Sequence, residues 1–150
     1  MTHDESYTSI VIASQAETFL SQVDPFSFLP DKEIEKVAAE VLIAHYKKDK
    51  ILFTQGQSTL DYIYIIQKGA AERYFEDDDE EKRLSGILME GQMFGGISIL
   101  VNHGVPVRTL KLAEKTYFYL LPKSYFLKLC ENYEVFSEYF TDTFGKRMMN

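Results

Sequence analysis

Residues 62–75, YIYIIQKGAAERYF, contain two short runs of aromatic and aliphatic residues separated at Gly69. Each run has the length of a β-strand; residues 62–66 are all aromatic or β-branched, which strands favour, and the second run ends in the aromatic pair Tyr74-Phe75. Glycine between such runs favours a turn, because it adopts backbone conformations that other residues avoid. The stretch therefore predicts two consecutive strands joined by a turn.

The same pattern continues on both sides of this stretch. Further apolar or aromatic runs occupy residues 41–46, 51–54, 84–88, 107–113 and 117–121, and turn-forming or charged residues separate them. Many short strands at this spacing are typical of a sandwich, a jelly roll or a small barrel. We predict a mainly β fold, an antiparallel β jelly roll over residues 41–121.

Helical periodicity replaces the strand pattern at both ends. Residues 14–23 repeat apolar positions at intervals of three and four, and a second helical segment opens at Pro30 and Asp31. The predicted N-terminal helical region is residues 14–39. Helical spacing returns at Pro122, a residue that suits a first helical turn, and continues over residues 122–150.

The last helix carries a wide apolar stripe. Its members are Phe136, Tyr139, Phe140, Phe144 and Met148. The stripe predicts a homodimer through this helix. Neither a glycine cap nor a proline closes the helix, so we expect the chain to be the N-terminal part of a longer protein, although a natural chain ending in a frayed helix would give the same pattern.

Composition limits the classes of function. The 150 residues are 45% hydrophobic and 26% charged, which indicates one folded domain over residues 1–150. Sixteen basic against 23 acidic residues give a net charge of −7, which disfavours nucleic acid and anionic membranes as partners. The apolar run 10–13 is too short for a signal peptide or a membrane span, so we expect a cytoplasmic protein.

Metal and catalytic chemistry find little support. One cysteine, Cys130, and three scattered histidines give no metal-ligand spacing, and no His-x-His occurs. The acidic run 76–81, EDDDEE, lacks the spacing of a calcium loop and is expected to be an exposed, mobile, metal-free hairpin tip. No acid–base pair supports a jelly-roll enzyme. We predict no catalytic residues and no cofactor.

The segment 90–113 is the best candidate for a site. Gly95 and Gly96 precede a short helical turn whose free backbone amides favour an anion. Arg108 follows in a strand that should return beside that turn, where it could pair with a phosphate. The alternative is a plain glycine turn with a surface arginine.

The order of elements and several motifs resemble the cyclic nucleotide-binding domain family, which includes the regulatory domains of the bacterial catabolite activator, of cyclic-nucleotide-dependent kinases and of gated channels. The resemblance begins near Phe19 and rests on residues 19–29 (FLSQVDPFSFL), 51–56, 62–69 (YIYIIQKG), 90–100 (EGQMFGGISIL) and the pair Arg108-Thr109. It implies an eight-stranded jelly roll flanked by helices, with a phosphate-binding segment at residues 90–109.

The resemblance also implies site residues. Gly95, the amides of Ile97 and Ser98, and Arg108 with Thr109 fall where the family contacts the cyclic phosphate. Gly96 stands where the family has the glutamate that holds the ribose hydroxyl. A degenerate pocket with weak or no binding of cyclic AMP and cyclic GMP is therefore expected. The helix that closes over the base in the family would reach it at or beyond Asn150 here.

Residues 119–132, YLLPKSYFLKLCEN, are similar to the corresponding part of bacterial signalling proteins in which this domain precedes CBS domains and a nucleotidyltransferase-like domain. The expected function is a regulatory sensor of a small, phosphate-containing, cyclic-nucleotide-like ligand in a multidomain signalling protein. The alternative is a vestigial, non-binding module for dimerisation or interaction. The state of Arg108 should discriminate, since a guanidinium facing a polar cavity favours sensing and one paired with an internal carboxylate favours the module.

Overall fold

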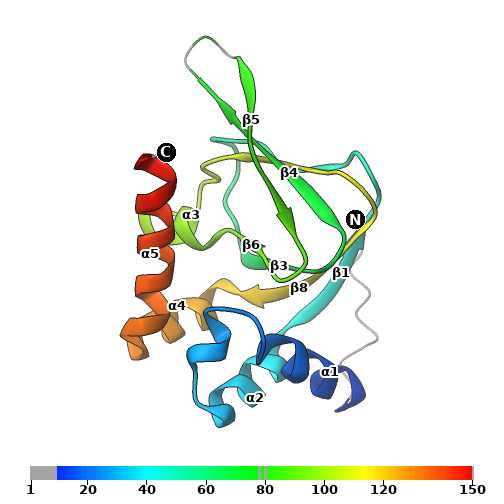
Figure 1. Ribbon diagram of the computed structural model, residues 1–150, viewed down its shortest axis with the longest axis vertical. Coiled ribbons are helices and arrows are strands. Elements are labelled where there is room, and N and C mark those ends of the chain that lie inside the picture. Colours follow the sequence, from blue (N-terminus) through cyan, green and yellow to red (C-terminus); the bar gives the residue numbers. More distant parts are fainter. Residues whose placement is uncertain (1–9, 78, 80, 150) are drawn as a thin grey trace.

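Two antiparallel sheets of four strands form the centre of the molecule (Figure 1). The computed structural model describes residues 10–77, 79 and 81–149. One sheet has the order β1 (Leu42–Tyr46), β8 (Thr116–Pro122), β3 (Tyr62–Lys68), β6 (Met93–Phe94). The other has the order β2 (Ile51–Phe53), β7 (Thr109–Leu112), β4 (Ala70–Glu76), β5 (Lys82–Met89). The predicted fold class is confirmed.

The strands differ from the sequence prediction mainly at their ends. β6 is only two residues long and has no periodic signal of its own, so its pairing with β3 is visible only in the folded chain. β7 begins at Thr109, two residues later than predicted, because the backbone N–H of Val107 donates to a serine side chain outside the sheet. That departure from the ladder places residues 107 and 108 beside the candidate site.

Helices cover one end and one side of the jelly roll (Figure 1). They are α1 (Ile10–Leu20), the short η2 (Phe26–Phe28), α2 (Asp31–Glu40), α3 (Gly96–Val101), α4 (Lys123–Asn132) and α5 (Glu134–Met149). α2 and α4 begin directly after Pro30 and Pro122, as the sequence predicted. No helix in the described ranges is both long enough and apolar enough to cross a bilayer.

An aromatic cluster joins these helices to each other. The rings of Phe126, Phe136 and Phe140 lie 5.1–5.9 Å apart in edge-on arrangements, and Phe26 of η2 packs against Phe136. Phe136 and Phe140 are buried within the domain. The stripe expected to mediate dimerisation is therefore partly an internal packing face. Tyr139 is half-buried. The side chains of Phe144 and Met148 lie outside the described part of the structure.

A carboxylate ties α2 to the C-terminal helices. The hydroxyl of Tyr125 donates to Glu33 Oε2 at 2.6 Å, and that of Tyr133 donates to Glu33 Oε1 at 3.1 Å. Burial and the hydrogen bond to Glu33 raise the pKa of Tyr125, so this phenol remains a donor at neutral pH. Tyr133 immediately precedes α5, so the start of that helix is held to α2.

The β4–β5 hairpin, which projects from the sheet in Figure 1, carries the acidic run. Arg83 lies 3.1 Å from Asp77 Oδ2 and 2.9 Å from Glu81 Oε2, so the run has a local counter-charge that the sequence interpretation overlooked. Asp79 and Glu81 are exposed, whereas Asp78 and Glu80 lie outside the described residues. Across the described chain no group of three metal-ligating side chains occurs. Burial raises the pKa of the Cys130 thiol to about 12, so it is protonated at neutral pH.

Candidate ligand-binding site

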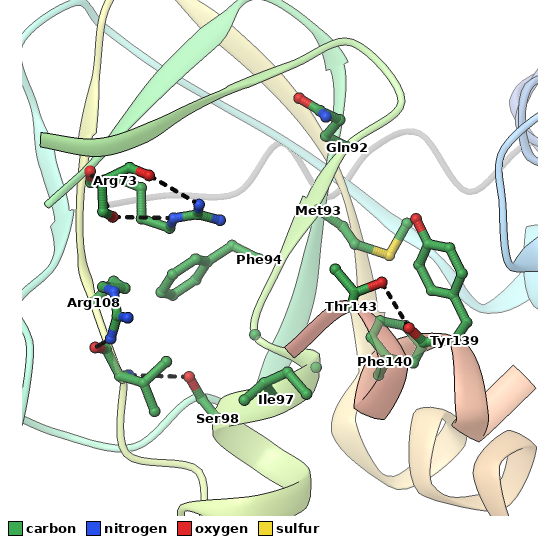
Figure 2. A pocket seen from close by; sticks show the side chains of 14 residues that line it. Arg73, Gln92, Met93, Phe94, Ile97, Ser98, Arg108, Tyr139, Phe140 and Thr143 are labelled. Atoms are coloured by element: carbon green, nitrogen blue, oxygen red, sulfur yellow. Dashed lines mark hydrogen bonds between the residues drawn. The ribbon is translucent and has the colours of Figure 1, made fainter. Parts of the chain in front are cut away.

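A cavity of about 430 Å³ lies between the β4–β5 hairpin, the β6–α3 segment and α5 (Figure 2). The residues that line it are Arg73, Ser85, Gln92, Met93, Phe94, Gly95, Gly96, Ile97, Ser98, Val107, Arg108, Tyr139, Phe140 and Thr143. Its size is within the range of sites for small ligands. Five of the six residues predicted from the sequence are among the lining residues.

Gly95 starts α3 in a conformation that needs glycine. Its φ is +118°, and a Cβ there would lie 3.2 Å from the carbonyl oxygen of Tyr62. Its own carbonyl accepts from the Ile99 N–H at 2.9 Å, which forms the first turn. The first amides of a helix, here those of Gly96, Ile97 and Ser98, have no acceptor within the helix. They belong to residues that line the cavity.

Ser98 connects α3 to the segment that carries the arginine. Its hydroxyl accepts from the N–H of Val107 at 3.1 Å, and its carbonyl accepts from the N–H of Gly104 at 2.8 Å. Ser98 is 1% exposed, so these hydrogen bonds are shielded from water. They fix the position of Val107 and, with it, of the adjacent Arg108.

Arg108 lines the cavity and is partly buried. Its Nη1 donates to the Val107 carbonyl at 2.7 Å, and its guanidinium carbon lies 4.7 Å from the centre of the Phe75 ring. Burial lowers the pKa of Arg108, yet guanidinium groups remain charged at neutral pH. No carboxylate of the described residues lies within 4.0 Å of it. Its positive charge is therefore uncompensated inside the cavity.

Gly96 is in close contact with α5. A Cβ at this position would lie 2.5 Å from Cδ1 and 2.6 Å from Cε1 of Phe140. Any larger residue would overlap the Phe140 ring unless α5 shifted. Gly96 stands where the resemblance implies a glutamate, and the Phe140 ring of α5 occupies the space that a side chain at this position would need.

α5 reaches the cavity earlier than the sequence interpretation expected. Tyr139, Phe140 and Thr143 line it, whereas the closing part of this helix was expected at or beyond residue 150. The packing of Phe140 against Gly96 brings the middle of α5 over the site, earlier along the chain than the family resemblance implied. The cavity has its own helical wall within the described residues.

Thr109 is the predicted residue that does not line the cavity. Its hydroxyl accepts from the backbone N–H of Gln55 at 2.9 Å and it is 1% exposed. It joins β7 to the residues that follow β2 instead of facing the open space.

Sequence reasoning missed Arg73 and Ser85, which line the cavity from β4 and β5. The signal for Arg73 was its place between Ala71 and Phe75, at alternate positions of a predicted strand where a basic residue interrupts an apolar face. Ser85 lies opposite a register shift between Arg73 and Tyr74, which no sequence pattern indicates.

Residues 43–133 match the cyclic nucleotide-binding domain family, and the chain belongs to that family. This is a regulatory, ligand-binding type of domain. No curated protein sequence matches the chain.

Solved structures show the same fold. The regulatory domain of Toxoplasma gondii PKA with cAMP superposes with a TM-score of 0.82 at 18% identity, covering 91% of this chain and 51% of that one. The sensor domain of the transcriptional regulator DNR from Pseudomonas aeruginosa gives 0.75 at 12% identity, covering 91% and 90%. The regulatory subunit of a cAMP-independent protein kinase A from Trypanosoma cruzi, bound to guanosine, gives 0.73 at 19%, covering 93% and 52%. The chain spans about half the length of these two kinase proteins.

Proposed function

We propose that this domain senses a small, phosphate-containing ligand in the cavity and regulates other parts of a signalling protein. The observation that carries the proposal is Arg108, a partly buried cation that lines the cavity without a carboxylate partner in the described chain. An arginine next to free helix amides is a strong combination for phosphate. Gly95, Gly96, Ile97 and Ser98 are the proposed partners of Arg108, while Thr109 supports β7.

Ordinary cyclic nucleotides fit this site poorly. The solved relatives hold cAMP or guanosine, but here Gly96 offers no acceptor to a ribose hydroxyl and Phe140 packs against it. The loss of one charge-assisted hydrogen bond weakens a ligand by roughly 1.5–3 kcal/mol, or about ten- to a hundredfold. We therefore expect cyclic AMP and cyclic GMP to bind weakly or not at all.

The proposal extends to the whole protein. The similarity of residues 119–132 to signalling proteins with CBS and nucleotidyltransferase-like domains supports a cytoplasmic, multidomain context with this chain as its N-terminal domain. A homodimer through α5 is part of the proposal. Because Phe136 and Phe140 are buried, the contact would use other residues of α5, such as the exposed Val135.

The second candidate function is a non-binding interaction module. The packing of Phe140 against Gly96 favours it, since this contact fills part of the family's ligand site with the domain's own side chain. The uncompensated charge of Arg108 favours sensing, because burying a cation without a partner costs free energy and contributes nothing to the stability of a core.

Titration calorimetry with inorganic phosphate, sulfate, cyclic AMP and cyclic GMP tests the proposal. The wild-type domain should bind phosphate or sulfate, Arg108→Ala should lose that binding, and Arg83→Ala should retain it because Arg83 is outside the cavity. Unchanged anion affinity in Arg108→Ala would refute the assigned site. Micromolar affinity for either cyclic nucleotide would refute the degenerate pocket, and absence of all anion binding would favour the interaction module.

A further inference from the structure

The two serines that line the cavity are hydrogen-bonded within the protein. The Ser85 hydroxyl donates to the Arg73 carbonyl at 3.1 Å and accepts from Arg73 Nε at 3.3 Å. The Ser98 hydroxyl accepts from the N–H of Val107 at 3.1 Å, and Ser98 is 1% exposed. Both hydroxyls therefore serve the protein's own structure before any ligand enters.

The remaining neutral polar side chains of the lining, Gln92 and Thr143, are engaged in the same way. Gln92 Oε1 accepts from the N–H of Met89 at 2.8 Å, and the Thr143 hydroxyl donates to the Tyr139 carbonyl at 2.7 Å. Among the lining side chains that the structure describes, the Tyr139 phenol is the one oxygen without such a bond. One phenol cannot serve the several hydroxyls of a sugar.

A carboxylate acceptor is also missing from the described lining, which includes no aspartate or glutamate. A hydroxyl that leaves water for this cavity gives up its hydrogen bonds to the solvent and gains few in return. The loss of such bonds is costly when no partner replaces them. The side chains of the cavity are therefore a poor match for a ligand body rich in hydroxyl groups.

Arg108 is the contrasting polar group of the lining. Its guanidinium has five N–H groups, of which the structure pairs one, on Nη1, with the Val107 carbonyl at 2.7 Å. Burial alone lowers the pKa of Arg108, so the charge to be compensated is a single one. One anionic group on a ligand would supply the acceptors and the counter-charge together.

Apolar side chains form much of the rest of the lining. They are Met93, Phe94, Ile97, Val107, Tyr139 and Phe140. Figure 2 shows Arg108 on one side of the cavity, with Met93, Tyr139 and Phe140 on the other. Met93 and Tyr139 are only half-buried, so part of their surface stays in water unless a ligand covers it. Covering such surface is favourable because it removes apolar area from water.

We infer that the cavity takes a small ligand with one anionic group at Arg108 and an apolar body, without sugar hydroxyls, against Met93 and Tyr139. This inference rests on the proposed function and specifies the ligand class of that site. An aryl monophosphate has this chemistry. A sugar phosphate or a nucleotide, whose body carries hydroxyls that need acceptors, does not.

The probe is 1-naphthyl phosphate, compared by titration calorimetry with inorganic phosphate and with ribose 5-phosphate. The wild-type domain should bind naphthyl phosphate at least about tenfold more tightly than inorganic phosphate, because its rings cover apolar surface that phosphate leaves in water. Ribose 5-phosphate should bind within about threefold of inorganic phosphate, since its hydroxyls exchange water for side-chain oxygens that already have partners.

Met93→Gln tests the apolar side of the cavity. Glutamine has nearly the length of methionine but replaces the thioether with an amide, so it should lower the preference for naphthyl phosphate at least about threefold. The affinity for inorganic phosphate should change less than about twofold. The matched control is Met89→Gln, the same substitution at an exposed methionine of β5 outside the cavity, which should keep the full preference.

Thermal unfolding of each variant checks the fold. If Met93→Gln does not fold, Val107→Thr takes its place, because threonine keeps the branched shape of valine and adds a hydroxyl to another lining side chain. Val107→Thr should also lower the preference for naphthyl phosphate, and Met89→Gln remains its control.

The outcomes separate this inference from the proposed function. A wild-type domain that binds inorganic phosphate but gains nothing from the naphthyl rings, or gains as much from ribose, overturns the inference and leaves the proposed function standing. So does a full preference in Met93→Gln or, where that variant does not fold, in Val107→Thr. Arg108→Ala with unchanged affinity for every probe, or a wild-type domain that binds none of them, overturns the proposed function and this inference with it.

Discussion

The two walls of the cavity are held in place by different forces. On the strand side, the Arg73 guanidinium donates hydrogen bonds to Ser85, that of Arg108 donates to the Val107 carbonyl, and the Val107 N–H donates to the Ser98 hydroxyl. On the helix side, Phe140 is positioned by aromatic packing and by contact with a glycine. The strand side of the cavity therefore depends on single polar contacts, whereas the helix side depends on volume and shape.

The largest expected effect is on the helix side of the cavity. Phe140→Ala should lower the free energy of unfolding by about 3 kcal/mol, because a nearly buried ring in contact with Phe126 and Phe136 leaves a cavity. Urea denaturation measures the change. Val135→Ala, on the exposed side of the same helix, is the control and should change stability by less than about 0.5 kcal/mol. Equal losses in the two variants would show that α5 is not packed as described.

The second effect concerns the glycine beneath Phe140. Gly96→Ala should destabilise the domain by about 1–3 kcal/mol because its Cβ overlaps the ring, although alanine is the better helix former by about 1 kcal/mol. In a double-mutant cycle, Gly96→Ala made on top of Phe140→Ala should be neutral or stabilising. If the two changes are additive, the contact between α3 and α5 is not the cause.

A smaller effect is expected on the strand side of the cavity. Ser98→Ala leaves the partly buried N–H of Val107 without its acceptor and should cost about 1–2 kcal/mol of stability. It should also reduce the phosphate affinity measured by calorimetry, because Arg108 loses its support. Ser137→Ala removes a half-buried serine of α5 that does not line the cavity and serves as the control. Full phosphate affinity in Ser98→Ala would mean that Arg108 is positioned independently of α3.

The smallest effect should come from the arginine outside the cavity. Arg83→Ala removes two ion pairs of an exposed arginine at the hairpin and should change stability by less than about 0.5 kcal/mol at moderate salt. Thermal and urea unfolding at two salt concentrations measure it. A loss above about 1 kcal/mol would show that the acidic hairpin contributes to the fold and not only to its surface.

The fold could be predicted because its signals are local. Short apolar and aromatic runs between turn residues indicated the strands, and the prolines before α2 and α4 indicated where those helices begin, whereas several strand ends differ from the prediction by one or more residues. The strand wall of the site was predictable for the same reason, since Gly95 and Arg108 belong to one short segment. The pairing of β6 with β3 could not be predicted, because a strand of two residues carries no periodicity.

The part of the site that α5 contributes could not be predicted without the three-dimensional structure. Nothing in the sequence near Gly96 indicates that Phe140, 44 positions later, occupies the space above it. Arg73 was missed for a similar reason: an arginine in a strand is usually at the surface, and only the bulge at Ser85 shows that it is directed into the cavity.

The attachment of α5 at its start gives the helix the mechanics of a lever. The hydrogen bond from Tyr133 to Glu33 holds the start of α5 at Glu134. Phe140, which contacts Gly96, lies about 9 Å from that start along the helix axis at 1.5 Å per residue. Met149, the last residue of the helix, is roughly 22 Å from the same starting point. A tilt that moves the helix by about 1 Å at Phe140 therefore moves its far end by about 2.5 Å. Sub-ångström displacements of Phe140 would therefore be enlarged at the end of α5 by the length of the helix alone, without any change inside the jelly roll.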